Sequence, residues 1–445
     1  MKRFILCIFC AFCVTMMVSA QIARHTQTFR SEKYVGGDIS LLTKYETNEA
    51  KYYDLDGKAI TDMLGFFKQQ GLNSMRVRLF VDPSKSGDIA ACQDLDYVKA
   101  LGKRIKDAGF SLMLDFHYSD TWADPGKQWT PDAWKSLSND QLYEKIYQYT
   151  TDCLQQMVAA GATPDFIQTG NEISYGMLWG TEAAVGKNNT NRCYTNSSNA
   201  NWQRFFNLLK KAGQACREVC PNAKIILHSE RAGNTNVLTD YFDRMKSNGI
   251  DYDIIGLSYY PYHHGTLEKL ETALNTLESK NYGKDIMIVE TGYYYAWQTT
   301  DFGGEGADLS KTYPISPAGQ QAFTKALIDL LNKHKSVKGL YWWWMEACEN
   351  GLDWNTQRVS GGWYNASLFN DSNTSDVGYP AGKAMPAIAE LKNFLEGETG
   401  IDAINHEPLT NNHIWYTLDG RRLSGKPTMK GLYIHNGRKV VVMSK

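Results

Sequence analysis

The sequence has no excess of charge of either sign. Its 47 Lys and Arg residues nearly balance 48 Asp and Glu residues, which gives a formal net charge of -1. Proteins that bind nucleic acid neutralise phosphates with a clustered basic excess, so the balance argues against a nucleic-acid partner. Hydrophobic residues make up 43% and charged residues 21% of the chain, a composition typical of a packed globular protein and not of a disordered one.

Long apolar runs are absent beyond the N-terminus, so no membrane span is expected. At the N-terminus, Lys2 and Arg3 precede the apolar run Phe4–Val18, and small residues follow up to Ala20. This pattern predicts a signal peptide over residues 1–20. The protein would then be exported and be periplasmic, held at the cell surface or secreted. A lipoprotein, anchored through a cysteine of the apolar run, is the alternative.

Cysteine spacing typical of a zinc site is also absent. Three of the nine cysteines lie in the apolar run, and the other six form no CxxC pair and have no His-rich partner spacing. An exported protein could pair these six as disulfides. Cys216 and Cys220, four residues apart on a predicted helix, are more simply interpreted as two free thiols.

What the chain does contain is an alternation of strand-like and helix-like segments. Eight short runs have strand character: Tyr34–Ile39, Asn73–Val81, Phe110–His117, Pro164–Gly170, Lys224–His228, Asp253–Tyr259, Asp285–Glu290 and Lys338–Met345. Longer segments between them have apolar residues at helical spacing, among them Ile60–Gln70, Leu95–Ala108, Leu142–Ala160, Trp202–Cys220, Leu267–Ser279 and Gln320–His334. The alternation predicts an α/β fold, a (β/α)₈ barrel. A doubly wound open sheet is the alternative, but no Gly-rich phosphate loop follows the first strand.

Three long segments follow predicted strands: Tyr118–Lys135, Ser174–Asn201 and Gly292–Pro317. In a barrel such loops lie at the C-terminal face, where substrates bind; plain surface insertions are the other interpretation. The 12% aromatic share includes 12 Trp and 26 Tyr, and flat rings with a polar group suit sugar stacking as well as a large core.

After about residue 395 the alternation of strand-like and helix-like segments stops. We expect the barrel domain to cover residues 21–395, a linker residues 396–413, and a small β-rich module residues 414–445. Turns in this module are predicted at Asp419-Gly420, Lys430-Gly431 and Asn436-Gly437. Its pattern resembles the small C-terminal modules of exported Bacteroidetes proteins, which implies a sorting or accessory element outside the chemistry.

Two glutamates close predicted strands. Asn171 and Glu172 follow the fourth strand, and Glu290 ends the seventh. A carboxylate at the end of a buried strand is costly unless it is paired or used. Two of them facing each other across a barrel mouth suit retaining glycoside hydrolysis, which needs carboxyl groups about 5–5.5 Å apart. For a single glutamate, a surface cap or a salt bridge would be the commoner explanation.

Seven motifs over residues 33–395 carry a more specific resemblance. They are GGDIS (Gly36–Ser40), NSMRVRLFVDP (Asn73–Pro83), LDFHYSDTWADPGKQ (Leu114–Gln128), GNEISYGMLW (Gly170–Trp179), GLSYYPYHHG (Gly256–Gly265), VETGYYY (Val289–Tyr295) and WYNASLF (Trp363–Phe369). With them the chain resembles the arabinogalactan endo-β-1,4-galactanases of glycoside hydrolase family 53. The resemblance implies a retaining (β/α)₈ enzyme that hydrolyses β-1,4-galactosidic bonds in pectic galactan or arabinogalactan, needs no cofactor and acts as a monomer.

The resemblance also implies roles for individual residues. Glu172 would be the general acid/base and Glu290 the nucleophile, with Asn171 holding the sugar 2-hydroxyl. Arg76 would pin the nucleophile and keep it ionised, since a nearby cation lowers a carboxylate pKa. Arg78 has the same strand parity and would help.

Further residues of the motifs would contact substrate. His117 would lie near the reacting sugar, although a structural histidine is the alternative. Tyr259 or Tyr260 would donate a hydrogen bond to the nucleophile, and parity does not decide between them. Trp343 would stack under the sugar, with Trp344 in reserve, because neighbours in a strand point to opposite faces. The remaining substrate-binding residues would be Asp38, Asp120, Trp122 and Asp124 on the donor side, with His264, Trp363 and Asn365 elsewhere.

The chain departs from the family pattern in two places. His263 stands where family members often carry a Trp, which puts one stacking subsite in doubt. The loop after strand seven corresponds to a calcium-binding region of some bacterial members, and it offers the oxygen ligands Asp301, Glu305 and Asp308. A structural calcium ion and a solvated acidic loop both remain open. As alternative functions we keep another retaining β-glycanase, such as a mannanase or xylanase, and a glycan-binding barrel without catalysis.

Overall fold

The fold is described from a computed structural model. The described residues are 33–182, 191–193, 199–296, 302–348, 363–370 and 381–396, and in the C-terminal part 415–417, 422–423, 427, 431–435 and 438–442. The chain divides into two compact units, Met1–Glu398 and Thr399–Lys445. The expected signal peptide, residues 1–20, and the expected linker from residue 397 on lie outside the described residues.

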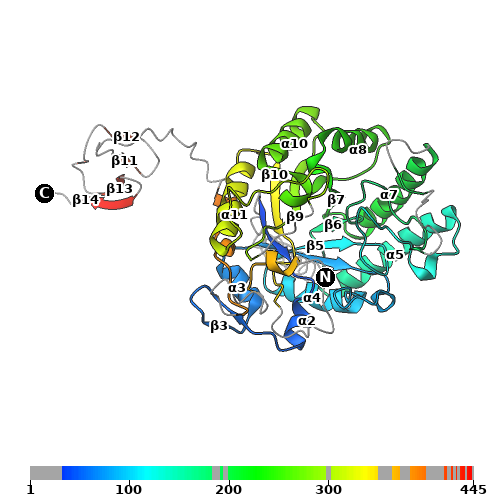
Figure 1. The fold of residues 1–445 in the computed structure, drawn as a ribbon, viewed down its shortest axis with the longest axis horizontal. Helices are drawn as coiled ribbons and strands as arrows, with labels where there is room; N and C mark the ends of the chain where they lie inside the picture. The colour runs from blue at the N-terminus through cyan, green and yellow to red at the C-terminus, as the bar shows by residue number, and fades with distance from the viewer. Residues whose placement is uncertain are drawn as a thin grey trace, which may run out of the picture. The chain divides into compact units, whose positions relative to one another are not determined.

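Eight parallel strands close into a barrel in the first unit (Figure 1), as the alternation of segments predicts. Going around the barrel, each strand pairs with its sequence neighbours, and β10 pairs with β1 to close it. The strands are β1 (Tyr34–Asp38), β4 (Ser74–Leu79), β5 (Ser111–Phe116), β6 (Phe166–Gln168), β7 (Lys224–Ser229), β8 (Ile254–Tyr259), β9 (Asp285–Thr291) and β10 (Val337–Trp342).

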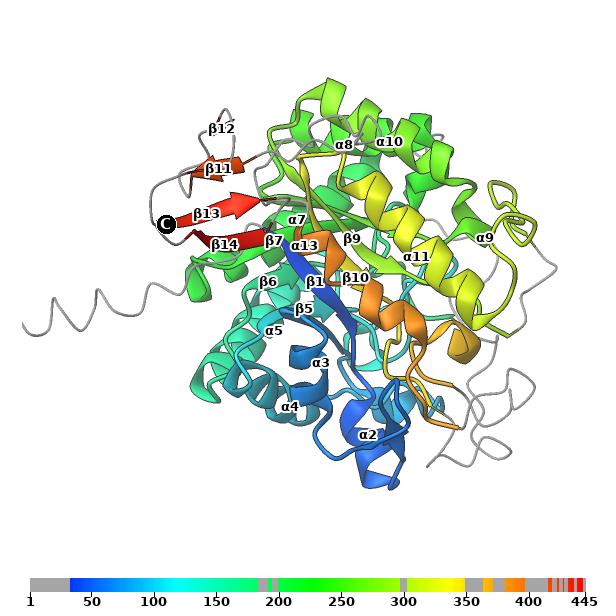
Figure 2. The same ribbon diagram turned by 90° about the vertical axis from the view of Figure 1, so that its left-hand side faces the viewer.

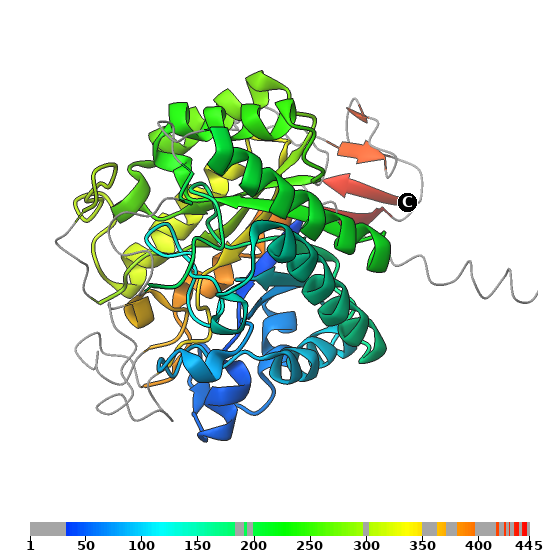
Figure 3. The ribbon, with the colours of Figure 1, turned by 90° about the vertical axis from the view of Figure 1, so that its right-hand side faces the viewer.

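Helices surround this barrel (Figure 2). The α-helices longer than eight residues are α4 (Leu95–Asp107), α5 (Asn139–Ala159), α7 (Asn199–Val219), α8 (Thr235–Ser247), α10 (Leu267–Lys280) and α11 (Pro317–Leu331). Shorter ones are α2 (Leu42–Thr47), α3 (Met63–Gln69), α9 (Pro261–His264) and α13 (Asn393–Glu396). The long helices α5 and α7 pack side by side on the outside of the barrel (Figure 3).

Glycines end several of these helices as the sequence predicts. Gly71, Gly109 and Gly161 follow α3, α4 and α5 with φ of +84°, +77° and +75°. In this left-handed region a Cβ would be strained, so glycine turns the chain towards the next strand at little cost. The three predicted long segments do follow β5, β6 and β9 and so leave the C-terminal ends of strands.

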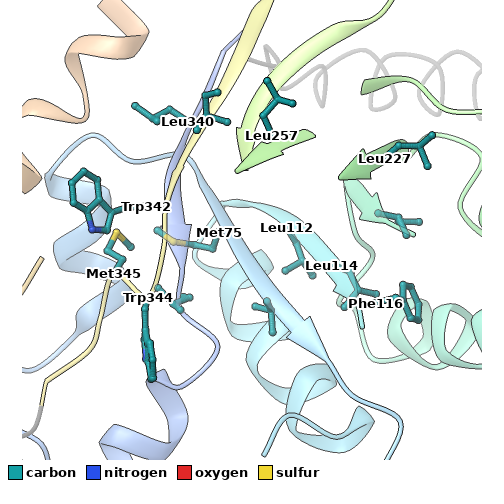
Figure 4. Close-up of a cluster of buried hydrophobic side chains, with 14 of the residues drawn as sticks. Met75, Leu112, Leu114, Phe116, Leu227, Leu257, Leu340, Trp342, Trp344 and Met345 are labelled. Atoms are coloured by element: carbon teal, nitrogen blue, oxygen red, sulfur yellow. The ribbon is translucent and has the colours of Figure 1, made fainter. Parts of the chain in front are cut away.

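Side chains along each strand alternate between the inside of the barrel and the surrounding helices. On β5, Leu112, Leu114 and Phe116 point outwards into the main hydrophobic cluster (Figure 4), whereas Met113 and Asp115 point into the barrel. The lower barrel is filled by an apolar cluster made of Met113, Phe166, Ile226, Ile254, Met287, Val289 and Tyr341. The next inward-pointing residues towards the C-terminal ends of the strands are polar, and they form the floor of the site.

Two smaller sheets complete the fold. β2 (Tyr52–Tyr53) and β3 (Ala59–Ile60) form a short antiparallel pair between the first two barrel strands. In the second unit, β11 (Trp415–Thr417), β12 (Arg422–Leu423), β13 (Gly431–His435) and β14 (Arg438–Val442) form an antiparallel sheet, ordered β12-β11-β13-β14. This agrees with a β-rich module. Its predicted turn residues Asp419, Gly420, Lys430, Asn436 and Gly437 lie outside the described residues.

Six cysteines of the described residues are free thiols: Cys92, Cys153, Cys193, Cys216, Cys220 and Cys348. The disulfides left open by the sequence are therefore not formed among these six. Burial raises the pKa of Cys216 and Cys220, so both are protonated, unreactive core thiols at neutral pH.

Candidate active site

Both glutamates singled out by the sequence line one cavity of about 600 Å³. Glu172 follows β6, the fourth barrel strand, and Glu290 lies on β9, the seventh. Ser258 of β8 connects the two, because it pairs in register with Glu290 and its Oγ donates a hydrogen bond to Glu172 Oε1 at 2.6 Å. The two carboxyl groups therefore share the mouth of the barrel.

A β-bulge turns Glu290 into the barrel. Met287 and Val289 point inwards, so simple alternation would send Glu290 outwards to the helices. The pairing of β9 with β8 shifts between Ile288 and Glu290, leaving Val289 without a register partner. Such a bulge adds one residue and re-aims the side chain that follows it. The inward orientation of Glu290 thus depends on this irregularity.

Glu290 has an ion-pair partner and a hydrogen-bond donor. Arg76 Nη2 lies 2.9 Å from its Oε1, and the hydroxyl of Tyr260 donates to its Oε2 at 3.0 Å. Burial raises the pKa of Glu290 to about 7, and the charge of Arg76 and the Tyr260 hydrogen bond oppose that rise. Arg76 itself is fully buried and is held by Asp38 at 3.0 Å and Asp115 at 2.7 Å.

Glu172 is in a less polar environment. Within the part of the chain that the structure describes, its carboxyl group receives one hydrogen bond, from Ser258, and its backbone has a φ of +49°. Burial, followed by the neighbouring charges of Glu290 and Glu230, raises the pKa of Glu172 well above its ordinary value. Because Arg76 and Tyr260 stabilise only the charge of Glu290, we assign the proton of the pair to Glu172.

The buried amide of Gln168 fixes a neighbouring histidine tautomer. Arg76 Nε donates to Gln168 Oε1 at 3.3 Å, and Gln168 Nε2 donates to Asp115 Oδ1 at 2.9 Å. The amide orientation is therefore set, because an arginine only donates and a carboxylate only accepts. Gln168 Nε2 also lies 2.8 Å from His228 Nδ1, which must then be the acceptor.

His228 in turn orients the hydroxyl that contacts Glu172. The backbone N–H of Glu172 also points at His228 Nδ1, at 3.2 Å. Asn171 Oδ1 lies 3.1 Å from the same nitrogen and receives a hydrogen bond from Arg76. Burial lowers the pKa of His228 well below its ordinary value, so the ring is neutral with its proton on Nε2. That proton faces Ser258 Oγ at 2.8 Å, and Ser258 donates onward to Glu172 Oε1. A proton on Glu172 must consequently lie on Oε2.

Asn171 lies in the cavity wall beside Glu172, as expected. Its Nδ2 donates to the carbonyl of Ala123 at 2.8 Å and its Oδ1 accepts from Arg76 at 2.9 Å. Gln128 Nε2 donates to its backbone carbonyl at 2.7 Å. These contacts fix the side chain at the carboxylate pair.

Three tryptophans form an aromatic wall. Trp122, Trp343 and Trp344 all line the cavity, and the ring centres of Trp122 and Trp343 are 6.1 Å apart. The parity argument that separated Trp343 from Trp344 does not apply, because β10 ends at Trp342 and Trp344 has a φ of +50°. Arg78 pairs with a different carboxylate from Glu290. It pairs with Asp38 at 2.6 Å and lies behind the Trp122 and Trp343 rings, at 4.6 and 4.8 Å.

Of the three acids expected on the donor side, Asp124 lines the cavity. Asp38 and Asp120 are not among the residues that line it. Asp38 binds Arg76 and Arg78, and Asp120 accepts backbone N–H groups of two loop residues, Asp82 at 3.1 Å and Asp132 at 2.8 Å. In both cases the carboxylate satisfies buried or loop donors of the protein itself.

The contacts of His117, Tyr259 and Tyr260 decide between the alternatives that the sequence left open for them. His117 Nδ1 accepts the backbone N–H of Ala123, and its other nitrogen faces Asp115 at 3.1 Å, which favours the structural interpretation. Tyr260 reaches Glu290, whereas Tyr259 donates to the carbonyl of Gly265 and is turned away.

His263 and His264 both line the cavity. His264 Nδ1 accepts the backbone N–H of Tyr260, and burial lowers the pKa of His264 to about 3, so it is neutral. Asn365 is buried, and its backbone carbonyl accepts the backbone N–H of Tyr295. Trp363 begins a short 3₁₀ helix, η4 (Trp363–Ala366), and its side chain lies outside the described part of the chain.

The possible calcium ligands have protein partners where they are described. Glu305 pairs with Lys269 at 3.2 Å and accepts from Asn234 at 3.0 Å, and Asp308 accepts the N–H of Ser310. Asp301 lies outside the described residues. Within the described ranges, no three His, Cys, Asp or Glu residues are grouped as a metal site.

The residues predicted for the site did not include several that the structure places there. Glu230 and Arg231 follow β7 and line the cavity, while Ser258, His228 and Asp115 form the buried network beneath it. A signal was present, since Asp115, His228 and Ser258 are polar residues at inward parity near the ends of apolar strands.

Comparison with known proteins decides the family. The family model described as glycosyl hydrolase family 53 matches residues 34–380, which is the whole barrel. The chain belongs to glycosyl hydrolase family 53. It is therefore a glycoside hydrolase.

Individual relatives agree with this assignment. The family 53 hydrolase is 32% identical to the arabinogalactan endo-beta-1,4-galactanase of Cellvibrio japonicus, over 85% of this chain and 95% of that protein. It is also 32% identical to the endo-beta-1,4-galactanase of Bacillus subtilis, over 69% and 68%. Among solved structures, the family 53 catalytic domain from Ignisphaera aggregans matches with a TM-score of 0.67 at 30% identity, covering 83% of this chain and 98% of that one.

The described part of this family 53 hydrolase contains no helix with the length and hydropathy needed to cross a membrane.

Proposed function

We propose that this family 53 hydrolase cleaves β-1,4-galactosidic bonds inside galactan or arabinogalactan chains, with retention of the anomeric configuration. The observation that carries the proposal is the unequal environment of two carboxyl groups in one cavity. Glu290 is held by Arg76 and Tyr260, whereas among the described residues the carboxyl group of Glu172 accepts a hydrogen bond from Ser258 alone. The names of the relatives supply the substrate class.

The reaction would proceed in two displacements. In the first, a carboxylate oxygen of Glu290 bonds to the anomeric carbon as the bond to the leaving oxygen breaks, and Glu172 gives its proton to that oxygen. In the second, Glu172 takes a proton from water, the water oxygen bonds to the anomeric carbon, and the ester to Glu290 breaks. Two inversions at one carbon give net retention.

The proton placement derived above suits the first step. Ser258 occupies Oε1 of Glu172 with a donated hydrogen bond, so the transferable proton lies on Oε2. Burial keeps that proton in place at neutral pH. Trp343 provides an apolar ring face 5.6 Å from the guanidinium that pairs with Glu290, where the reacting sugar would stack.

Replacing Glu290 tests the nucleophile directly. Glu290→Gln keeps the shape of the side chain and removes its charge, and we expect turnover of linear β-1,4-galactan to fall by on the order of 10³-fold or more, as when a covalent nucleophile is lost. Reducing-end release measures this, and Glu144→Gln, at an exposed surface pair with Lys211, is the matched control. Glu290→Gln turning over galactan at the normal rate would refute the assignment.

Two measurements separate the alternatives. Reducing ends released from galactan, mannan and xylan distinguish a galactanase from another β-glycanase, and NMR of the first product gives its anomeric configuration. With Glu290→Ala and added azide, a galactosyl azide of α-configuration forms only if the missing carboxylate is the nucleophile. Binding of galactan without any hydrolysis by the native protein would instead indicate a glycan-binding barrel.

The cellular location is a separate proposal, which rests on the sequence alone. We propose that residues 1–20 direct export and that the mature enzyme acts outside the cytoplasm, where polymeric galactan is met. The positive residues, the apolar run and the small residues ending at Ala20 support this.

A further inference from the structure

The cavity has two chemically different walls. The aromatic wall lies over β10 and β5, and the facing wall is built by segments that follow β7, β8 and β9. In the closed barrel, β7 and β8 lie opposite β1 and β4, so the two walls face each other across the mouth. The residues of the second, polar wall include Glu230, Arg231, Asn234, His263, His264 and Glu305.

The chemistry of the proposed reaction assigns a part of the substrate to each wall. The sugar that bonds to Glu290 must lie over that carboxylate, beside Trp343, whose ring stands over the Arg76 guanidinium. Glu172 gives its proton to the oxygen on the other side of the scissile bond. Glu172 follows β6, next to β7 in the barrel. The departing part of the chain therefore meets the polar wall.

Glu230 and Arg231 are built into that wall as a fixed pair. Glu230 is only 6% exposed, and its Oε1 accepts from Ser174 Oγ and faces Arg231 Nε at 2.9 Å. Arg231 Nε also donates to Ser174 Oγ at 3.0 Å, and its guanidinium stacks 4.0 Å from the ring centre of Tyr175. Ser174 and Tyr175, together with the contact between Glu230 and Arg231 themselves, thus hold the two charged groups in one orientation.

Each member of the pair keeps one buried polar atom without a hydrogen-bond partner among the described residues. These atoms are Glu230 Oε2, an acceptor, and Arg231 Nη2, a donor. Leaving such atoms unpaired is costly unless a ligand completes them. Two neighbouring sugar hydroxyls fit this need, because one donates to a carboxylate while the other accepts from a guanidinium.

We propose that Glu230 and Arg231 bind two hydroxyls of the first galactose residue on the leaving-group side and so make the enzyme selective for a sugar as leaving group. The proposal rests on the proposed galactanase function and adds the residues that recognise the departing chain. The same pair would hold a sugar acceptor when the glycosyl-enzyme transfers to a carbohydrate hydroxyl instead of water.

The test compares two substrates that share the glycone and differ in the leaving group. One is 4-nitrophenyl β-1,4-galactobioside, whose leaving group has no sugar hydroxyls, and the other is β-1,4-galactotetraose. For Glu230→Gln and Arg231→Lys, we expect kcat/KM for the tetraose to fall about 10- to 100-fold more than kcat/KM for the aryl glycoside, as for a lost hydrogen bond to a charged group. Transfer to added galactobiose should fall in parallel.

Three further measurements keep the test decisive. Glu144→Gln, an exposed carboxylate on α5, should leave the ratio of the two kcat/KM values unchanged. Thermal melting of each variant identifies a folding defect, and Arg231→Lys provides a second variant that keeps the charge. The pH profile of the aryl glycoside reports on Glu172 separately from leaving-group contacts.

Two results would overturn the inference while the proposed function stands. One is an equal fall of kcat/KM for both substrates in a folded variant. The other is a retained ratio with an alkaline limb moved to lower pH, which would mean that Glu230 acts only by raising the pKa of Glu172. Native enzyme that hydrolyses neither galactan nor the aryl galactobioside would overturn the proposed function itself.

Discussion

Ser258 is the side chain whose hydroxyl contacts the carboxyl group of the expected acid/base. Its hydroxyl donates to Glu172 Oε1 because neutral His228 supplies the proton on the other side. A donated hydrogen bond stabilises the charged form, so Ser258 lowers the pKa of Glu172 against the larger effect of burial. One hydroxyl therefore both orients the acid and moderates its strength.

Replacing Ser258 by Ala should move the alkaline limb of activity. Without the donated hydrogen bond the pKa of Glu172 rises further, and Glu172 must be protonated for the first step, so the alkaline limb of kcat/KM should shift to higher pH. The rate at the optimum should fall several-fold because the carboxyl group is less well oriented. A pH profile on 4-nitrophenyl β-1,4-galactobioside measures both effects.

The neighbouring Ser229, on β7, provides a control, since its Oγ accepts the backbone N–H of Arg231. Ser229→Ala should leave the alkaline limb in place. If Ser258→Ala leaves it unmoved as well, or moves it to lower pH, Ser258 does not donate to Glu172 in the working enzyme.

At the scale of residues, the motifs identified the two glutamates, but they did not settle the orientation of every side chain around them. Spacing alone placed Glu172 and Glu290 at the ends of the fourth and seventh strands, and both line the cavity. It left Tyr259 and Tyr260 undecided and separated Trp343 from Trp344 wrongly. Both pairs lie where a strand ends, and there the alternation of side chains stops being a guide.

At the scale of elements, the eight strands and the helices between them were predictable because apolar alternation and glycine caps mark them locally. Observed strand ends differ from the predicted ones by one to three residues at most positions, for instance Phe166–Gln168 within the predicted Pro164–Gly170. The bulge at Val289 could not be read from the sequence. It depends on pairing with β8 and β10, which is a tertiary property.

Closure of the barrel depends on a glycine of β1. Gly36 pairs with Ser74 of β4 and with Tyr341 of β10, and a Cβ on it would lie 1.6 Å from the carbonyl oxygen of Ser74. Gly36→Ala must push β1 away from β4. We expect the free energy of unfolding to fall by about 1–3 kcal/mol or more, as for overpacking in a core, measured by urea unfolding.

Gly303 is the matched control, because a Cβ there meets nothing within 4 Å. Gly303→Ala should change the free energy of unfolding by no more than about 0.5 kcal/mol, as for an ordinary surface substitution. Equal urea midpoints for Gly36→Ala and Gly303→Ala would show that the contact between β1 and β4 is not as tight as the structure has it.

At the scale of the whole molecule, several carboxyl groups are buried at positions where apolar side chains would make the folded protein more stable. Glu172, Glu290 and Glu346 all have a raised pKa, with burial as the largest cause. Glu346 is fully buried beyond β10, where its Oε1 accepts the N–H of Leu41 at 2.7 Å and its backbone carbonyl accepts the hydroxyl of Tyr52. It fastens the segment after β1 to the segment after β10, next to the closing seam of the barrel.

Glu346 should make the protein less stable as the pH rises. Burial, helped by the charge of Asp38 and opposed by Arg78, raises its pKa to about 8 in the folded protein, against about 4.3 in an unfolded chain. Between these values the folded state binds more protons than the unfolded state, so the free energy of unfolding falls with increasing pH. Glu346→Gln keeps an acceptor for Leu41 and removes the titration. Its stability relative to the native protein should therefore rise between pH 5 and pH 9, by on the order of a few kcal/mol.

Urea unfolding of both proteins at several pH values measures this difference. Glu172 and Glu290 contribute the same slope to both, so their effect cancels in the comparison and only the proton of Glu346 remains. Curves that run parallel from pH 5 to pH 9 would mean that the folded protein does not hold that proton. A stability of Glu346→Gln that falls relative to the native protein with rising pH would reverse the sign of the linkage. The expected relative rise would show that a neutral carboxylic acid lies next to the closing seam of the barrel, kept protonated by burial, which is also the largest cause of the raised pKa of Glu172.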